Sequence, residues 1–225
     1  MLLALETAND HCSVALYDGQ RLLALREDDR TREQTRLILP MIDSMLADVQ
    51  QRVADIQVIA FSRGPGSFSG VRINAAVAQG LAWTHDIPVV PVSSLRALAQ
   101  AAYRSQQLPQ VIAVLDARMN ELYCAGYQLD GQQLMQALTP EQLIPYNDTA
   151  LVTENAQAIV GSGSLLFNPS LGLPRYADVT ASAMDIALLG YADWQAGKAV
   201  PAAQALPVYL RDNAWKKIAE QKRGI

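Results

Sequence analysis

The first 20 residues, MLLALETANDHCSVALYDGQ (residues 1–20), indicate how the chain folds. Leu2 to Leu5 form an apolar run, and Cys12 to Tyr17 form a second run of residues that favour strands. Asp18-Gly19 is a strong signal for a tight hairpin turn, and a third strand is expected from Arg21 to Glu27. We therefore expect the chain to begin with three strands joined by a loop and a hairpin turn.

The same pattern returns in VIAVLDARMNELYCAGYQLDG (residues 111–131). An apolar run ends at Asp116 as the first one ends at Glu6, and Cys124 stands where Cys12 stood. A second Asp-Gly turn follows at residues 130–131. Each element alone is common, but the ordered set indicates a duplicated domain.

Between the two copies, hydrophobic periodicity predicts alternating helices and strands. The expected elements are a helix over residues 33–50, a strand near Val58 to Ser62, a helix over residues 70–84, a strand near Val89 to Val92 and a helix from Ser94 to Tyr103. Three linked strands followed by helix, strand, helix, strand and helix are typical of the ribonuclease H-like unit. Two such units in tandem make the actin-like ATPase (ASKHA) architecture, and this α/β fold is the predicted fold class.

The second copy is expected to be a reduced unit. We place the first unit at residues 1–106 and the second at residues 107–225, with the C-terminal segment free to pack back on the first. The elements expected in the second unit are a short helix opened by Thr139-Pro140-Glu141, strands near Leu151 and Ala158, a GSGS loop at residues 161–164, and a long helix from a Ser182…Asp185 cap to Gly197.

The stretch RGPGSFSGVRI (residues 63–73) has the glycine content of a phosphate-binding loop. A Walker A loop requires Gly-Lys-[Ser/Thr], but Val71-Arg72 follows Gly70, and Ser69 stands where a dinucleotide fingerprint needs its third glycine. An anion site at the helix N-terminus near Arg72 remains open, and a tight turn that lets two segments approach closely is the favoured alternative. The loop motif comprises Arg63, Gly64, Pro65, Gly66, Gly70 and Arg72.

Two helices are more apolar than a single core contact requires. The helix over residues 70–84 is apolar almost all round and rich in alanine, so we expect it to be buried on more than one side. The helix over residues 33–50 has a wide stripe with methionines, which suit adaptable partner surfaces. We predict that both helices form an oligomer interface. Its expected residues are Leu37, Ile38, Met41, Ile42, Met45, Ile73, Ala76, Val77 and Gly80.

The sequence offers few residues for a self-sufficient active site. The only histidines, His11 and His85, are far apart, which argues against a histidine-based metal site and against a nucleophile–base dyad. Glu6 and Asp116 are expected to face each other across a cleft, where carboxylates hold magnesium in a working actin-like ATPase. With Gly161 and Gly163 of the GSGS loop, they form a candidate cofactor-binding cleft in vestigial form. Carboxylates that only cap turns are the simpler alternative.

Composition narrows the function classes further. The net charge of −4 gives no overall basic face for gripping nucleic acid. Cys12 and Cys124 lie far apart without C-x-x-C spacing, which argues against a disulfide scaffold or a zinc site. The sequence shows no leader motif and no apolar run of membrane-spanning length, so we expect a cytoplasmic protein.

These stretches resemble a known family. RGPGSFSGVRI, together with LALETANDHCSVAL, REQTRLILPMI, LDARMNELY and PVYLRDNAWKK, is similar to the bacterial tRNA threonylcarbamoyladenosine biosynthesis protein TsaB, also called YeaZ, along nearly the whole chain. The resemblance implies a two-lobed actin-like fold and a role in making threonylcarbamoyladenosine next to the anticodon of tRNAs that read ANN codons. It also implies a non-catalytic scaffold that homodimerises and that pairs through its first-unit helices with TsaD, the paralogue that transfers the group to tRNA.

Further partners and the absence of a cofactor are implied in the same way. TsaE, a P-loop ATPase, is a further implied partner, and tRNA is met through the complex. ATP or ADP and metal belong to the partner subunits, so the resemblance implies that this chain requires no cofactor. TsaD carries a His-x-x-x-His metal motif where this sequence has Ser94 and Leu98, and neither residue replaces an imidazole as a metal ligand.

The leading hypothesis is therefore a scaffold and activator of TsaD. The alternative is an actin-like ATPase or small-molecule kinase that uses Glu6 and Asp116 with magnesium. A peptidase is a third possibility, for which the sequence offers no paired nucleophile and base.

Overall fold

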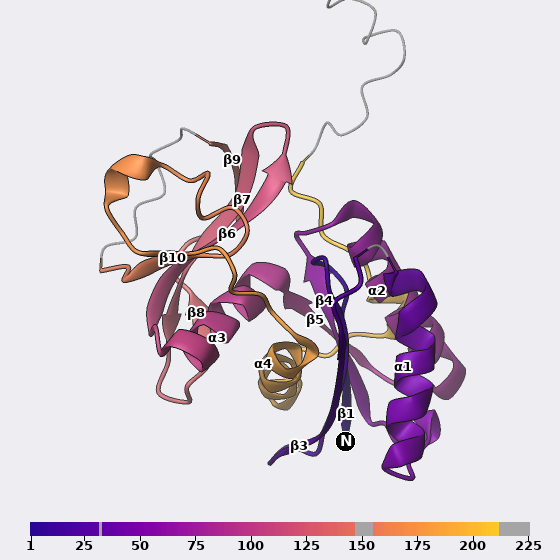
Figure 1. The fold of residues 1–225 in the computed structure, drawn as a ribbon. Coiled ribbons are helices and arrows are strands. Elements are labelled where there is room, and N and C mark those ends of the chain that lie inside the picture. The colour runs from indigo at the N-terminus through magenta and orange to yellow at the C-terminus, as the bar shows by residue number, and fades with distance from the viewer. Residues whose placement is uncertain (32, 147–154, 212–225) are drawn as a thin grey trace, which may run out of the picture.

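The computed structural model describes residues 1–31, 33–146 and 155–211, which form two β-sheets with helices between and around them (Figure 1). The strands of the first sheet are β1 (Leu2–Glu6), β2 (Cys12–Tyr17), β3 (Leu22–Asp28), β4 (Val58–Gly64) and β5 (Val89–Ser93). Those of the second are β6 (Gln110–Arg118), β7 (Glu121–Leu129), β8 (Met135–Ala137), β9 (Gln142–Pro145), β10 (Ala158–Val160) and β11 (Arg175–Tyr176). The helices are α1 (Gln34–Asp48), α2 (Phe68–His85), α3 (Ser94–Gln106) and α4 (Ala183–Gln195), with 3-10 turns η1 (Val53–Asp55), η2 (Pro169–Leu171) and η3 (Ala202–Gln204).

The first sheet has the strand order β3-β2-β1-β4-β5. β1 pairs with β2 in antiparallel register, with Leu5 opposite Val14, and β2 pairs with β3 in the same sense. β1 pairs with β4, and β4 with β5, in parallel, because a helix crosses over between each pair. This is the order of the ribonuclease H-like unit that the sequence predicts.

The second sheet repeats this plan. Its order is β11-β10-β6-β7-β8, with β6–β7 and β7–β8 antiparallel and β6–β10 and β10–β11 parallel. β6 thus takes the place of β1, and β10 takes the place of β4. The duplication predicted from the sequence is confirmed, and the two sheets give the actin-like fold.

The helix that follows the last strand of each sheet packs on the other sheet. α1 and α2 cover one face of the first sheet, and α4, which follows β11, covers its other face. α3, which follows β5, packs against β6, β7 and β8 of the second sheet. We call the first sheet with α1, α2 and α4 the first lobe, and the second sheet with α3 the second lobe. The domain division at residues 106 and 107 stays a prediction.

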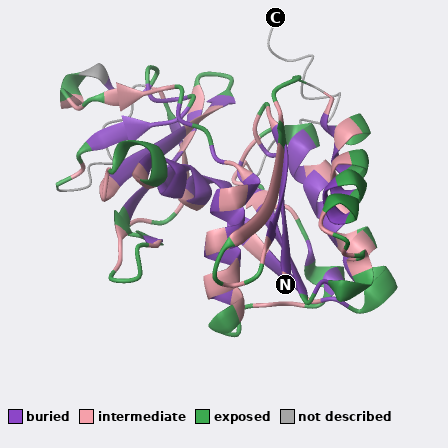
Figure 2. Cartoon of the chain, turned by 60° about the horizontal axis from the view of Figure 1, so that its bottom comes forward, coloured by how far each residue is buried: buried purple, intermediate pink, exposed green. Residues whose placement is uncertain are grey.

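Most helix starts follow from their capping residues. The Ser67 and Ser93 hydroxyls accept the backbone N–H groups of Gly70 and Arg96 at the starts of α2 and α3. α4 has the predicted capping box. The Ser182 hydroxyl accepts the backbone N–H of Met184, and the Asp185 carboxylate accepts the backbone N–H of Ser182. Figure 2 shows the central strands buried, whereas edge strand β3 is partly exposed and the exposed residues lie on the outward sides of the helices and in the loops.

One predicted helix is wrong. Thr139-Pro140-Glu141 opens no helix; residues 142–145 form β9, which pairs with β7. The Thr139 hydroxyl accepts the backbone N–H of Gly126 instead of capping a helix, and the Glu141 carboxylate binds Arg63. Pairing with an available strand thus overrides the local start signal. The predicted strand near Leu151 lies outside the described residues, whereas the strand at Ala158 is confirmed.

Within the described ranges, none of the helices combines the length and the apolar character needed to span a membrane.

Candidate functional site

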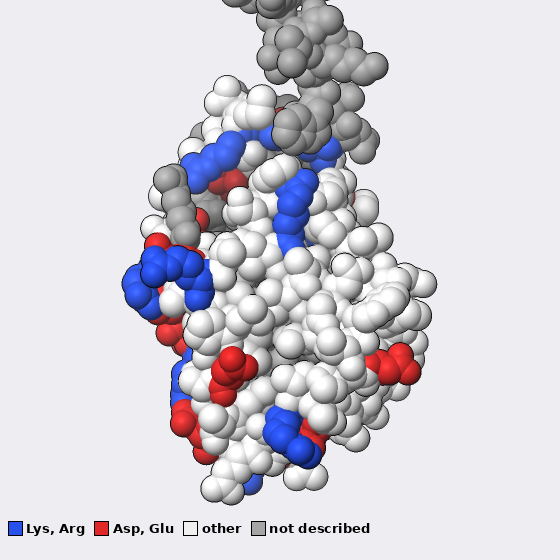
Figure 3. All heavy atoms as spheres, turned by 90° about the vertical axis from the view of Figure 1, so that its right-hand side faces the viewer, with Lys and Arg blue, Asp and Glu red and all other residues white. Residues whose placement is uncertain are grey.

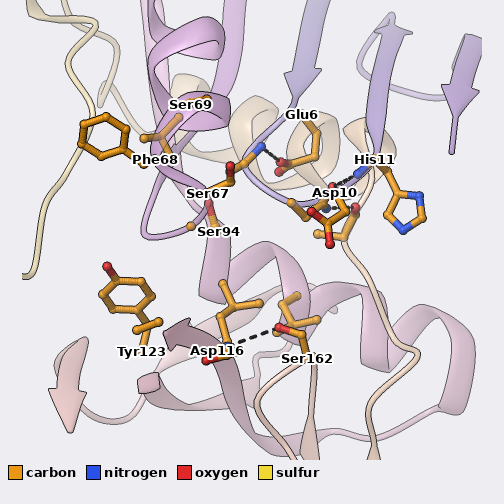
Figure 4. A pocket seen from close by; sticks show the side chains of 18 of the residues that line it. Glu6, Asp10, His11, Ser67, Phe68, Ser69, Ser94, Asp116, Tyr123 and Ser162 are labelled. Atoms are coloured by element: carbon orange, nitrogen blue, oxygen red, sulfur yellow. Dashed lines mark hydrogen bonds between the residues drawn. The ribbon is translucent and has the colours of Figure 1, made fainter. Parts of the chain in front are cut away.

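A cavity of about 1220 Å³ lies between the two lobes (Figure 4). Its walls come from the loop after β1, the first turn of α2, the start of α3, the β6–β7 turn and residues 208–211. Glu6 and Asp116 line it from opposite lobes, and Ser162 of the GSGS loop lies beside Asp116. The duplication thus brings the two strand-end carboxylates to one cavity, as the sequence predicts.

Glu6 is held inside the first lobe. Its carboxylate is 1% exposed, and Oε1 accepts the backbone N–H of Ala8 at 2.5 Å. Oε2 has no hydrogen-bond partner among the described residues. Burial raises the pKa of Glu6 to about 7, against the lowering effect of the hydrogen bond from Ala8. A carboxylate that is buried against its own loop is poorly placed to meet the water shell of a magnesium ion.

Asp116 is held by neighbours of its own lobe. Its Oδ2 lies 3.0 Å from Arg118 Nη1, and its Oδ1 accepts the Arg118 backbone N–H and the Tyr146 hydroxyl at 2.8 and 2.9 Å. The Asp116 backbone N–H donates to Ser162 Oγ at 3.3 Å. The side chain therefore stabilises the β6–β7 turn, which agrees with the simpler alternative of a carboxylate that caps a turn.

Gly161 and Gly163, predicted as part of a cofactor-binding cleft, do not line the cavity. A Cβ at Gly161 would lie 2.4 Å from Leu98 Cδ2 and 2.6 Å from Val114 O, and Gly161 has φ +99°. A Cβ at Gly163 would lie 2.8 Å from Val114 Cγ1. The prediction is wrong for these two residues, because they let the loop pack tightly on β6 rather than open toward a ligand.

Ser94 and Leu98 lie on the cavity wall, on the first turns of α3. Leu98 is 2% exposed and fills the space that Gly161 leaves. The buried Ser94 hydroxyl has no hydrogen-bond partner within the described ranges. His11 pairs with Asp29 at 2.9 Å on the exposed rim, and residues 1–31, 33–146 and 155–211 contain no cluster of three or more His, Cys, Asp or Glu that could hold a metal ion.

The glycine loop serves close packing. A Cβ at Gly66 would lie 2.4 Å from Ala8 O, and a Cβ at Gly70 would lie 1.9 Å from Thr7 O. The two segments are joined by Ser67 N–H to Ala8 O and by the Thr7 hydroxyl to Gly70 O, both at 2.7 Å. The favoured alternative of a tight turn that lets two segments approach closely is confirmed.

The remaining motif residues bind within the chain. Gly64 has φ +100° and precedes Pro65 through a cis peptide bond, and the Arg63 side chain reaches Glu141 of the second lobe at 3.0 Å. The Arg72 guanidinium lies 3.3 Å from the centre of the Phe68 ring and 4.8 Å from that of Tyr209, and it donates to Phe68 O at 2.9 Å. Arg72 is thus already engaged beside the helix N-terminus, and the anion site stays a prediction.

The outer surface of α1 and α2 is the second candidate site. Ile38, Ile42 and Met45 were predicted at an interface, but each is at most 1% exposed and packs on the first sheet, so that assignment is wrong for these three. Leu37, Met41, Ile73 and Val77 are partly exposed, and Ala76 and Gly80 are exposed. Their role at an interface stays a prediction. Figure 3 shows this side of the molecule as largely free of charged side chains.

Sequence reasoning missed two contributors to these surfaces. Trp83 is 70% exposed on α2, and its spacing of i+7 from Ala76 and i+3 from Gly80 could have placed it on the same face. Tyr209 joins the cavity wall only because the C-terminal segment returns to α2, and no local pattern signals that return.

Comparisons with known proteins agree with this architecture. Residues 29–220 match the family model described as TsaD, tRNA N6-adenosine threonylcarbamoyltransferase. The chain is 36% identical to the tRNA threonylcarbamoyladenosine biosynthesis protein TsaB of Haemophilus influenzae, over 96% of each chain. It is also 36% identical to the protein of that name in Escherichia coli, over 96% of this chain and 97% of the relative. The solved structure of YeaZ from Pseudomonas aeruginosa superposes with a TM-score of 0.86 at 38% identity, covering 93% of this chain and 99% of that one.

Proposed function

The chain belongs to the TsaB (YeaZ) family, and from this premise we propose that it is a non-catalytic subunit in the synthesis of tRNA threonylcarbamoyladenosine, acting as a scaffold and activator of TsaD. The partner surface is the outer face of α1 and α2. In this proposal the same face serves a homodimer and a heterodimer with TsaD, TsaE joins as a third subunit, and the complex meets tRNA in the cytoplasm. Any nucleotide or metal belongs to the partners.

The observation that carries the proposal is the exposed face of α2. Ala76 and Gly80 are exposed in the middle of the helix, and a Cβ at Gly80 would have no heavy atom within 4 Å. Small residues let another helix approach closely, and the partly exposed Leu37 and Met41 of α1 extend the apolar surface. A helix of this composition facing water is typical of a surface that another protein covers.

The cavity supports a non-catalytic role. The Glu6 carboxylate is buried against its own loop, and Asp116 is bound by Arg118 and Tyr146. Leu98 occupies a position where the resemblance to TsaD expects a metal-binding histidine, and it offers no donor atom. The alternative, an ATPase or kinase that uses Glu6 and Asp116 with magnesium, would require both carboxylates to leave these contacts.

A matched pair of glycine substitutions tests the surface. Gly80→Phe places a large ring on α2, and Gly131→Phe places the same ring in the β7–β8 turn, where a Cβ also has no heavy atom within 4 Å. Overpacking of about 1–3 kcal/mol at a helix–helix contact weakens binding by roughly 5- to 150-fold. We expect Gly80→Phe to lose dimers in analytical ultracentrifugation and to lose capture of purified TsaD, and Gly131→Phe to keep both. Equal behaviour of the two variants would refute the surface.

Reconstitution tests the function itself. This chain is added to, or left out of, a mixture of TsaD, TsaE, unmodified tRNA, ATP, threonine, bicarbonate and TsaC, the protein that makes threonylcarbamoyl-adenylate in this pathway. The modified nucleoside is then measured by mass spectrometry. We expect the product only when the chain and TsaD are both present. Magnesium-dependent ATP hydrolysis by the chain alone, abolished by Glu6→Gln or Asp116→Asn, would instead support the alternative.

A further inference from the structure

Residues 205–211, which we call the clasp segment, join the two lobes along one wall of the cavity. The chain before them belongs to the first lobe: Val200 pairs with Val89 at the sheet edge, and Gln79 Nε2 of α2 donates to Ala202 O at 3.2 Å. In Figure 1 the yellow segment then leaves α2 and runs toward the β6–β7 turn. Val208, Tyr209 and Arg211 line the cavity on the way.

The first half of the clasp segment is fixed to the glycine loop. The Val208 backbone N–H donates to Arg63 O at 2.8 Å. The Tyr209 ring lies on one side of the Arg72 guanidinium, at 4.8 Å from its centre, with the Phe68 ring at 3.3 Å. A guanidinium within about 6 Å of two aromatic rings is attracted to both, and this contact holds the segment against the start of α2.

The second half is fixed to the second lobe by one side chain. Arg211 Nη2 donates to Ala117 O at 3.2 Å and to Arg118 O at 3.3 Å, and it forms an ion pair with the Glu121 carboxylate. The side chain is 21% exposed, so these contacts are largely shielded from water. A guanidinium suits several acceptors at once, because its donors form a rigid planar fork.

The turn that receives Arg211 has an unusual backbone. Arg118, Met119 and Asn120 have φ values of +62°, +57° and +62°, a region that residues other than glycine rarely occupy. Such a conformation persists only where neighbouring contacts hold it. Arg211 supplies contacts to two carbonyl groups at the start of this turn.

We propose that the clasp segment sets the width of the cavity by fastening the two lobes, with Arg211 as the residue that closes it. Two lobes joined by a few crossing segments can rotate about them, and a contact at the rim then decides how far they open. The Arg63–Glu141 ion pair, at 3.0 Å, lies at the same crossing and adds to the fastening. This inference concerns the isolated chain and does not depend on the proposed function.

Distances between spin labels on the two lobes test the clasp. Cysteines replace two exposed residues, Arg36 near the start of α1 and Ser170 in η2, while the native Cys12 and Cys124 are buried and should not react. Labelled protein is diluted with unlabelled protein, so that distances between copies do not contribute. Pulsed electron–electron double resonance then gives the distance distribution between the two labels. We expect one narrow distribution for the parent chain and a longer, broader one for Arg211→Ala.

Arg118→Ala is the matched control. It removes another arginine from the same turn, but Arg118 pairs with Asp116 within the second lobe. We expect the control to keep the parent distribution. The proposal is overturned if Arg211→Ala keeps the parent distribution while its circular dichroism and melting temperature confirm a folded protein. It is equally overturned if both variants widen the distance by the same amount, because the effect would then belong to the turn and not to the clasp.

Discussion

The two lobes share one sheet plan but differ in what covers it. The first sheet has long helices on both faces, whereas the second has α3 on one face and, on the other, the segment around η2, from which Phe167, Leu171 and Leu173 pack on the strands. In the described part of the second lobe, η2 stands where the first lobe has α2, between the fourth and fifth strands of the plan. The strands therefore carry the duplicated fold, and the long helices of the first lobe carry the surface that a partner can use.

The strand-end carboxylates differ in the same way. Glu6 faces inward and binds its own loop, and Asp116 faces a turn and an arginine. Equivalent positions in the two sheets thus serve two different structural roles. The two lobes thus keep the same strand topology, while the side chains at matching positions make different contacts.

The largest expected effect on stability concerns α3 and α4, which we call the exchanged helices because each packs on the sheet of the other half of the chain. Arg104 of α3 binds the fully buried Asp185 of α4 through two bonds of 2.9 and 3.0 Å. Arg104→Ala leaves that carboxylate unpaired, and we expect a loss of about 3–5 kcal/mol in the free energy of unfolding, measured by urea titration. Arg36→Ala, which removes an exposed pair with Glu33, should cost about 0–1 kcal/mol. Similar losses for both variants would show that the Arg104–Asp185 pair does not stabilise the packing of α3 against α4.

The next effect concerns Glu6 and the pH dependence of stability. Burial raises the pKa of Glu6 from its ordinary value of 4.5 to about 7 in the folded state. The folded state therefore favours the protonated form, and the stability linked to Glu6 is complete below pH 4.5 and is lost as the pH rises through 7. The difference corresponds to about 3 kcal/mol. Glu6→Gln should remove this loss, so that the variant gains stability relative to the parent between pH 5 and pH 8. Parallel stability curves for the two proteins would contradict the burial argument.

Glycine substitutions compare the two close approaches. Gly70→Ala places a Cβ 1.9 Å from Thr7 O, against backbone that cannot turn away, and we expect a loss of about 1–3 kcal/mol or more. Gly163→Ala places a Cβ 2.8 Å from Val114 Cγ1 and 2.9 Å from the Leu115 carbonyl carbon, and it should cost less because these contacts are longer than the 1.9 Å contact at Gly70. Thermal unfolding of both variants measures the difference. A larger loss at Gly163 would mean that the second lobe is the more tightly packed of the two.

The smallest effect has the opposite sign. Gly80→Ala adds a methyl group inside α2 where a Cβ has no heavy atom within 4 Å. Alanine in a helix interior is more favourable than glycine by about 0.5–1 kcal/mol, so the melting temperature of the isolated chain should rise. A fall would show that the space beside Gly80 is not open in solution.

The sequence predicts the five strands of the first sheet and β6, β7 and β10 of the second because each carries its own local signal, whereas β8, β9 and β11 are short and were not predicted. The strand-forming run from Cys12 to Tyr17, the Asp18-Gly19 turn and their repeat after Val111 are local features, and local features survive folding. The helix expected at Thr139 fails because its residues find partners in β7 and in Arg63, which lie far away in sequence. The exchange of α3 and α4 could not be predicted, because periodicity shows that a helix has a buried face but not which sheet receives it.

For the candidate site, the sequence predicted which residues lie at the strand ends but not the contacts that these residues make. The strand-end positions of Glu6 and Asp116 follow from the repeat, but their partners Ala8, Arg118 and Tyr146 depend on the turns. The stripe on α1 includes both core and surface residues, and only the orientation of the helix on the sheet separates Ile38 from Leu37. The contacts of Arg211 carry no local signal in the sequence, because its guanidinium is enclosed by the β6–β7 turn, which lies about 90 residues earlier in the chain.

The exchange of the helices also bears on how the protein is made. The face of the first sheet that includes Leu2, Ala4 and Ala60 is covered by Ile186 and Leu189 of α4, which leave the ribosome long after β5 does. Until then, Ala97 of α3 packs on that apolar face but the cover from α4 is missing, and α3 itself must wait for β6 and β7. Domains usually fold as they emerge, N-terminal first. In this chain neither lobe can be completed until most of the sequence has been synthesised, so a nascent or truncated chain exposes a surface suited to chaperones and to aggregation.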